Sequence, residues 1–206
     1  MNVPLLALDN GEQSDRDAFR RDVFAGLSQA PRAIPAKYLY DARGSALFDA
    51  ICDQPEYYPT RTEAAILRQH APEIARLAGP GTALVEYGSG SSVKTRLLLD
   101  AMPGLQAYVP IDISRQHLET TARRLREDYP GLRIAPVTGD YMALDALPDT
   151  VGDARRVGFF PGSTIGNLVP EEAVLFLKRA RRLLREDGAL LLGVDLKKDP
   201  QRQEVY

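Results

Sequence analysis

Cysteine is nearly absent from this sequence, and histidine is rare. The one cysteine, Cys52, excludes an intramolecular disulfide framework and indicates the cytoplasm as the compartment. The two histidines, His70 and His117, stand in no cluster with the spacing of metal ligands, so we expect no metal.

Long apolar runs and an excess of one charge are missing as well. The longest apolar runs, such as residues 189–194, are far too short to span a bilayer, and the first nine residues lack the charged start of a signal peptide. The net charge is −2, with a pI near 5.8, which gives no electrostatic footprint for nucleic acid. We therefore expect no nucleic-acid or membrane partners, and we also expect a monomer.

The first part of the chain is predicted to be helical. Residues 1–13 are expected to form a loose tail, and apolar residues then recur at helical spacing across residues 14–80, with no convincing strand. One of the expected helices covers roughly residues 62–77, and Pro72 is expected to kink or split it.

The pattern changes after the glycine–proline segment at residues 79–81. Apolar strands are predicted at residues 83–87, 107–111, 133–138, 156–160 and 189–194, and helical patterns separate most of them. This alternation predicts a parallel, doubly wound, Rossmann-like α/β sheet over residues 81–197. Ligands of such sheets bind at the carboxyl ends of the strands, which directs attention to the residues found there.

A glycine turn follows the first strand of this region, and two of its interpretations fit poorly. A dinucleotide-binding turn has a third glycine, but Val93 stands at that position after Gly88 and Gly90. A phosphate-binding loop matches at Gly88, Lys94 and Thr95, but the same valine replaces the glycine that lets the backbone wrap around phosphates.

A site for S-adenosylmethionine (SAM) explains more of the pattern. Glu86 precedes the glycine turn, Asp112 ends the second strand, and Asp140 follows the third. Asp112 is placed to accept both ribose hydroxyls and Asp140 the adenine amino group, with Tyr141 stacking nearby. Three acids at three strand ends suit a cationic ligand that carries no phosphates, so we favour SAM.

The same segments resemble a known family, the SAM-dependent histidine Nα-methyltransferases of ergothioneine biosynthesis. The stretches that carry the resemblance span nearly the whole chain: residues 37–45, 55–61, 86–95, 110–114, 139–141, 159–168 and 204–206. The resemblance implies a class I methyltransferase fold and three methylations of the α-amino group of histidine, which give hercynine. It also implies that the imidazole-reading residues lie in a second domain, of which residues 198–206 are the start, and that the closing strands of the sheet are missing here.

The resemblance also assigns residues to the two ligands. Gly88, Lys94, Asp112, Asp140 and Tyr141 would hold SAM. Glu86 and Gly90, in the stretch that forms the glycine turn, are also expected to bind the cofactor. Tyr58, Asn167 and Tyr206 would hold the amino acid, and no residue is singled out as a catalytic acid or base.

Without the resemblance, simpler roles remain open for three of these residues. Lys94 would then be a solvated residue of a helical turn, Tyr58 a packing residue and Asn167 a turn residue. Two alternatives to the histidine hypothesis also stay open. One is a methyltransferase for another amino acid or amine, and the other is a SAM-binding fragment without turnover.

Overall fold

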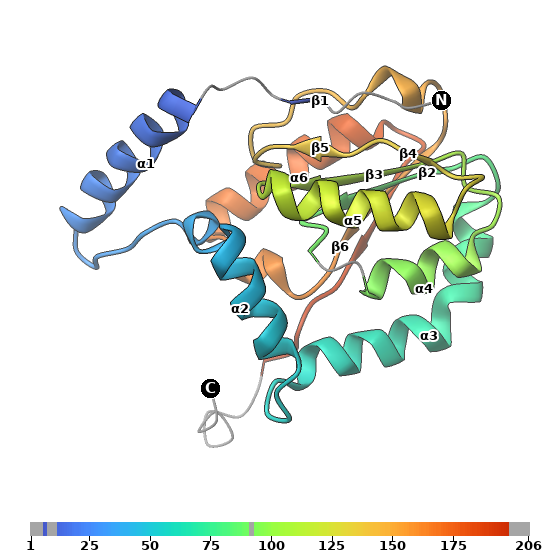
Figure 1. Cartoon of the computed structure of the whole chain (residues 1–206), viewed down its shortest axis with the longest axis horizontal. Helices are drawn as coiled ribbons and strands as arrows, with labels where there is room; N and C mark the ends of the chain where they lie inside the picture. Colours follow the sequence, from blue (N-terminus) through green and yellow to red (C-terminus); the bar gives the residue numbers. More distant parts are fainter. Residues whose placement is uncertain (1–5, 8–11, 91–92, 198–206) are drawn as a thin grey trace.

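A parallel β-sheet forms the centre of the molecule (Figure 1). The structure, a computed structural model, describes residues 6–7, 12–90 and 93–197. The strands are β1 (Leu6–Ala7), β2 (Ala83–Tyr87), β3 (Ala107–Asp112), β4 (Arg133–Ile134), β5 (Val137–Thr138), β6 (Arg156–Phe160) and β7 (Ala189–Leu192). Their order is β1-β5-β3-β2-β6-β7, with β4 paired to β3, and every pairing is parallel. The predicted sheet is confirmed.

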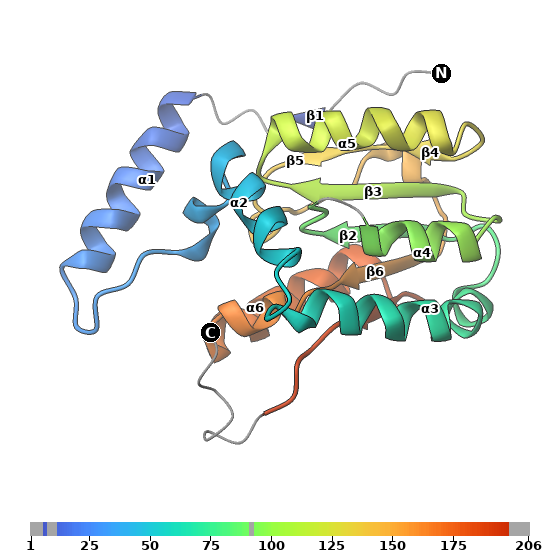
Figure 2. The ribbon, with the colours of Figure 1, turned by 60° about the horizontal axis from the view of Figure 1, so that its bottom comes forward.

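Helices cover both faces of this sheet (Figure 2). On one face lie α3 (Tyr58–Ala78), α4 (Val93–Ala101) and α5 (Arg115–Asp128), and on the other lies α6 (Pro170–Leu184). Successive side chains of a strand point to opposite faces. Accordingly, Leu84 of β2 packs in the cluster under α3–α5, whereas Val85 and Tyr87 pack in the cluster under α6. Burial on both faces explains why the strands are apolar almost throughout.

Three N-terminal helices lie beyond the carboxyl ends of the strands. They are α1 (Glu12–Leu27), the short 3₁₀ helix η1 (Ala36–Leu39) and α2 (Ala42–Cys52), and both views show α1 standing apart from the sheet (Figures 1 and 2). Asp41 caps α2, since its Oδ1 accepts the backbone N–H of Gly44 at 2.7 Å. Two further 3₁₀ helices, η2 (Asp149–Val151) and η3 (Thr164–Asn167), lie in loops before and after β6.

Several expectations about element boundaries were wrong. Helix α3 runs from Tyr58 to Ala78 without being split at Pro72, and it begins earlier than predicted because Pro59 suits a first helical turn. The stretch 133–138 forms two short strands, β4 and β5, instead of one. Leu6–Ala7 does not belong to a loose tail, because it pairs with β5.

Candidate functional site

The glycine turn after β2 is held against the end of β3. Gly88 and Gly90 have positive φ values of 77° and 46°, a region that glycine enters readily. The N–H groups of Gly88 and Ser89 donate to the carbonyl oxygen of Ile111 at 2.9 and 3.2 Å. A Cβ added to either glycine would meet nothing within 4 Å, so the turn has open space beside it, where a ligand can approach the backbone.

Asp112 lies beside this turn, as the sequence predicted from its place at a strand end. One carboxylate oxygen accepts the N–H of Gly90 at 3.2 Å, and the other accepts the N–H of Ser114 at 2.9 Å. Ser114 occupies the N-cap position of α5 but makes no capping bond through its side chain. Asp112 therefore joins the glycine turn to the start of α5, while its partial exposure leaves it accessible to a ligand.

Glu86 is buried among hydroxyl groups on the α4 side of the sheet. Its carboxylate accepts the hydroxyl of Thr95 at 2.7 and 2.8 Å and the hydroxyl of Tyr108, and the residue is 1% exposed. Burial raises the pKa of Glu86 to about 8, against the opposing effect of those hydrogen bonds. The carboxyl group therefore faces the protein interior, where its partners lie in α4 and β3.

Asp140 receives a partner that the sequence did not suggest. Its Oδ1 accepts the N–H of Met142 at 2.8 Å, and its Oδ2 lies 3.4 Å from the ammonium of Lys37 in η1. Lys37 also lies 3.5 Å from Asp22 of α1. Burial opposes the charge on Lys37, but these carboxylates outweigh it, so the pKa of Lys37 is raised. The predicted adenine-binding acid thus connects the sheet to η1 and α1.

Tyr141 packs into an aromatic cluster. Its ring meets Tyr87, Phe160 and Phe176 edge-on, with centroids 6.3, 5.4 and 5.7 Å away. Burial raises the pKa of Tyr141 to about 12, so its hydroxyl stays protonated at neutral pH. The side chain is half-buried, so part of it remains accessible.

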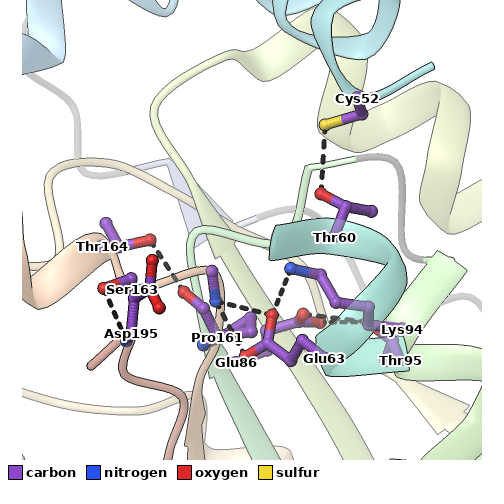
Figure 3. A network of polar contacts seen from close by, with 11 residues as sticks. Cys52, Thr60, Glu63, Glu86, Lys94, Thr95, Pro161, Ser163, Thr164 and Asp195 are labelled. Carbon is purple, nitrogen blue, oxygen red and sulfur yellow. Dashed lines mark hydrogen bonds and ion pairs between the residues drawn. The ribbon is translucent and has the colours of Figure 1, made fainter. Parts of the chain in front are cut away.

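Lys94 does not project into solvent but forms an ion pair with Glu63 of α3 (Figure 3). Lys94 Nζ lies 2.6 Å from Glu63 Oε2, and the two side chains are only 18% and 16% exposed. Both oxygens of Glu63 also accept the backbone N–H of Gly162, in the turn after β6, at 3.0 and 2.9 Å. The pair joins α3, α4 and that turn.

Asp195 contacts one of the predicted substrate residues, Tyr58, and the turn after β6. The hydroxyl of Tyr58 donates to Asp195 Oδ2 at 2.7 Å, and the backbone N–H of Asp195 donates to Ser163 Oγ at 3.1 Å. Ser163 has a positive φ of 57°, in the turn that leads to η3. Asn167 ends η3 and is exposed, whereas Tyr206 lies outside the described residues. Tyr58 and the post-β6 turn are thus brought together through Asp195.

Within the described residues, no group of three or more histidine, cysteine, aspartate or glutamate side chains gathers as around a metal ion. A search of the same residues finds no helix that is long and apolar enough to cross a membrane.

Comparison with known proteins decides between the interpretations of the glycine turn. Residues 19–204 match the model of a family described as "histidine-specific methyltransferase, SAM-dependent". The chain belongs to this family. The cofactor predicted from the glycine turn and the acids, SAM, is the one that the family's description names, so the dinucleotide and phosphate-loop interpretations are set aside.

Curated relatives agree with this assignment. The histidine N-alpha-methyltransferase of Mycolicibacterium smegmatis is 47% identical over 92% of this chain, and that of Mycobacterium tuberculosis is 44% identical over 93%. A fungal relative, ergothioneine biosynthesis protein 1 of Neurospora crassa, is 34% identical over 84% of the chain. The chain spans about three-fifths of the length of the two bacterial relatives, 59% and 60%.

Solved structures support the fold alone. A SAM-dependent methyltransferase of Methanococcus maripaludis superposes with a TM-score of 0.51 at 18% identity, over 75% of this chain and 64% of that one. A protein of Bordetella parapertussis gives a TM-score of 0.54 at 17% identity, over 88% and 70%. The expected class I methyltransferase architecture is confirmed.

Sequence reasoning missed three charged residues of this region: Lys37, Glu63 and Asp195. Asp195 directly follows the last strand, so the rule that found Asp112 and Asp140 also points to it. Glu63 and Lys37 lie on helices that are far in the sequence from the end of any of these strands, and no local pattern singles them out. Only the packing of α3 and η1 over the sheet brings them to the site.

Proposed function

We propose that this chain carries the cofactor site and part of the acceptor site of a SAM-dependent methyltransferase. The acceptor that we propose is the α-amino group of L-histidine, methylated three times to hercynine in ergothioneine biosynthesis. The supporting observation is that an open glycine turn and two acids lie at the ends of adjacent parallel strands, in a chain similar to histidine N-alpha-methyltransferases.

The residues at the strand ends fit SAM. The open turn at Gly88 and Gly90 admits a ligand to the backbone, and Asp112 and Asp140 supply hydrogen-bond acceptors for hydroxyl and amino groups. Lys94 supplies a cation for a carboxylate. When bound, SAM supplies a methyl group activated by the sulfonium to which it is attached.

The acceptor side must present an amine with a free lone pair. An α-ammonium group has to release a proton to solvent before each methylation, and a carboxylate close by attracts the ammonium as it binds. We propose that Tyr58 and Asn167 orient the amine and that Asp195, bonded to Tyr58, supplies this negative charge. Positioning of this kind can supply about 7–11 kcal/mol in well-oriented systems.

Further parts of the proposal concern the rest of the protein. We propose that Tyr206 contacts the amino acid and that residues 198–206 lead into a domain that reads the imidazole. The longer bacterial relatives support this division, since they share this chain over only 59% and 60% of their length. We also propose a cytoplasmic protein that uses no nucleic acid. We propose that it is a monomer, which analytical ultracentrifugation tests.

Cofactor titration combined with a methyl-transfer assay tests the proposed function. We expect binding of SAM and of its product S-adenosylhomocysteine, and the appearance of mono-, di- and trimethylated histidine by mass spectrometry. SAM binding without turnover would support a binding fragment and overturn the catalytic part. Absence of SAM binding would overturn the whole proposal.

A different acceptor is the second candidate. A relative from Claviceps purpurea is named 4-dimethylallyltryptophan N-methyltransferase and is 27% identical over 96% of this chain. The same assay should therefore include tryptophan and a simple primary amine beside histidine. Faster methylation of either would replace histidine as the proposed acceptor.

A further inference from the structure

Glu63 reaches the cofactor region from α3, outside the sheet whose strand ends form that region. The close-up shows its carboxylate between the ammonium of Lys94 and the turn after β6 (Figure 3). The contacts with Lys94 Nζ and Gly162 N are 2.6–3.0 Å long. No other side chain among the described residues is bonded in this way to both α4 and that turn.

Two glycines lie beside the ion pair between Glu63 and Lys94. A Cβ added to Gly193, just after β7, would lie 1.8 Å from Glu63 Oε1, and one added to Gly162 would lie 3.4 Å from Lys94 Nζ. Gly193 itself is held by a bond from its N–H to the carbonyl oxygen of Phe160 at 2.9 Å. A side chain at Gly193 would therefore collide with the Glu63 carboxylate, whereas one at Gly162 would make only an ordinary contact with Lys94.

We infer that Glu63 is a positioning residue that holds the ammonium of Lys94 ready for the amino-acid end of the cofactor. A lysine side chain has a flexible four-carbon stem, and fixing it costs rotamer entropy. The bond to Glu63 meets this cost before the ligand arrives, which is the principle of preorganisation. The inference rests on the proposed cofactor role of Lys94.

Charge repulsion between Glu63 and the cofactor does not reverse this effect. The amino-acid end of the cofactor carries one ammonium and one carboxylate, so its net charge is zero. An ammonium of Lys94 without its partner would attract the carboxylate but repel the ammonium beside it. The affinity for the amino-acid end therefore depends on where the ammonium of Lys94 lies, and Glu63 fixes that position.

The test compares two ligands that share a nucleoside and a thioether. S-adenosylhomocysteine has the amino-acid end, whereas 5′-methylthioadenosine lacks it. In Glu63→Gln, the amide oxygen can still accept the N–H of Gly162, but the ion pair is lost. By calorimetry we expect this variant to bind S-adenosylhomocysteine about tenfold more weakly and methylthioadenosine within twofold of the original chain.

A second variant reaches the same contact without removing a charge. Gly193→Ala places a methyl group against Glu63 Oε1 and should push the carboxylate away from Lys94, giving the same selective loss. The matched control is Glu73→Gln, an exposed glutamate of the same helix bonded to His70, which should bind both ligands unchanged. Thermal unfolding of each variant verifies that it folds.

The outcomes separate this inference from the proposed function. An equal loss for both ligands would reduce Glu63 to a purely structural role and overturn the inference. Unchanged or tighter binding of S-adenosylhomocysteine by Glu63→Gln would also overturn it, since Glu63 would then be neutral or a competitor. Failure of the original chain to bind either ligand would overturn the cofactor proposal itself.

Discussion

The sheet region and the N-terminal helices differ in where their apolar side chains lie. In the sheet region, Leu98 and Phe176 are at most 1% exposed, in two clusters that cover both faces. In the N-terminal helices, Phe19, Phe24 and Leu47 are 48%, 63% and 56% exposed. The sheet region thus has its own hydrophobic core, whereas polar contacts such as that between Lys37 and Asp140 help to hold α1 and η1 in place.

Truncation of one aromatic side chain in each region tests this contrast most strongly. Phe176 packs against Phe160 and Tyr87 with centroids 4.4 and 5.1 Å apart, so Phe176→Ala should lower the free energy of unfolding by about 3–5 kcal/mol. Phe24→Ala removes an exposed ring and should change it by less than about 0.5 kcal/mol. Urea denaturation measures both, and equal losses would contradict the contrast.

The regions should also differ in cofactor binding when an acid is removed from each. Asp112→Ala deletes a carboxylate that holds Gly90 and faces the open turn, so we expect about a 100-fold loss of affinity for S-adenosylhomocysteine. Asp22→Ala deletes the α1 acid that contacts Tyr38 and Lys37 and should change this affinity less than about threefold. A loss of affinity in Asp22→Ala as large as in Asp112→Ala would make α1 part of the cofactor site.

The two regions were also unequally predictable from sequence. Strands β2 and β6 were predicted at their observed bounds, because burial on both faces leaves apolar runs that glycine and proline delimit. The acid Asp112 followed from the same rule, since parallel strands end at one edge. In the sheet region, the local sequence pattern and the tertiary structure therefore agree.

Other features depend on tertiary contacts and could not be predicted from local sequence patterns. Pro72 predicted a kink or a break, but α3 is not broken there and continues to Ala78, packed on the sheet by Leu67 and Ala78. The ion pair between Glu63 and Lys94 joins residues that are 31 positions apart, and no periodic pattern encodes such a pair. Glu86 was correctly placed near the turn, but its partners Thr95 and Tyr108 come from α4 and the neighbouring strand, and no local pattern indicates them.

The buried carboxyl group of Glu86 gives the sheet region a dependence on pH. Its pKa is raised to about 8 in the folded protein, so the folded state binds more protons than the unfolded state between about pH 4.5 and 8. The free energy of unfolding should therefore fall as pH rises through this range, by at most about 1.4 kcal/mol per pH unit from this group.

Glu86→Gln removes this titration while keeping the shape of the side chain, and the hydroxyls of Thr95 and Tyr108 can accept from its amide. We expect its stability to change less steeply with pH, as measured by urea denaturation from pH 5 to pH 9. Glu73→Gln, an exposed change, is the control and should keep the original slope. An unchanged slope in Glu86→Gln would show that the carboxyl group is ionised across this range.

The smallest effects are expected at the proposed acceptor site. Tyr58 begins α3, directly after the N-terminal helices in the chain, whereas Asn167 ends η3, after β6. In an active form of the enzyme, Asn167→Ala should raise the KM for histidine about five- to tenfold, since one hydrogen bond is worth about 1 kcal/mol. Affinity for S-adenosylhomocysteine should stay within twofold, and Gln116→Ala, an exposed amide of α5, is the matched control.

Tyr58→Phe should act in the same direction, because it removes the hydroxyl that contacts Asp195 but leaves the ring in place. If both side chains orient one amine, the double variant should lose less than the product of the single losses, because groups that share a partner do not act independently. Losses that multiply fully would assign the two residues to separate tasks, with Tyr58 then serving only to fix Asp195 and the end of β7. A loss of cofactor affinity in Asn167→Ala would place that residue in the cofactor site instead, and the division of labour between the sheet ends and the acceptor segments would fail at this position.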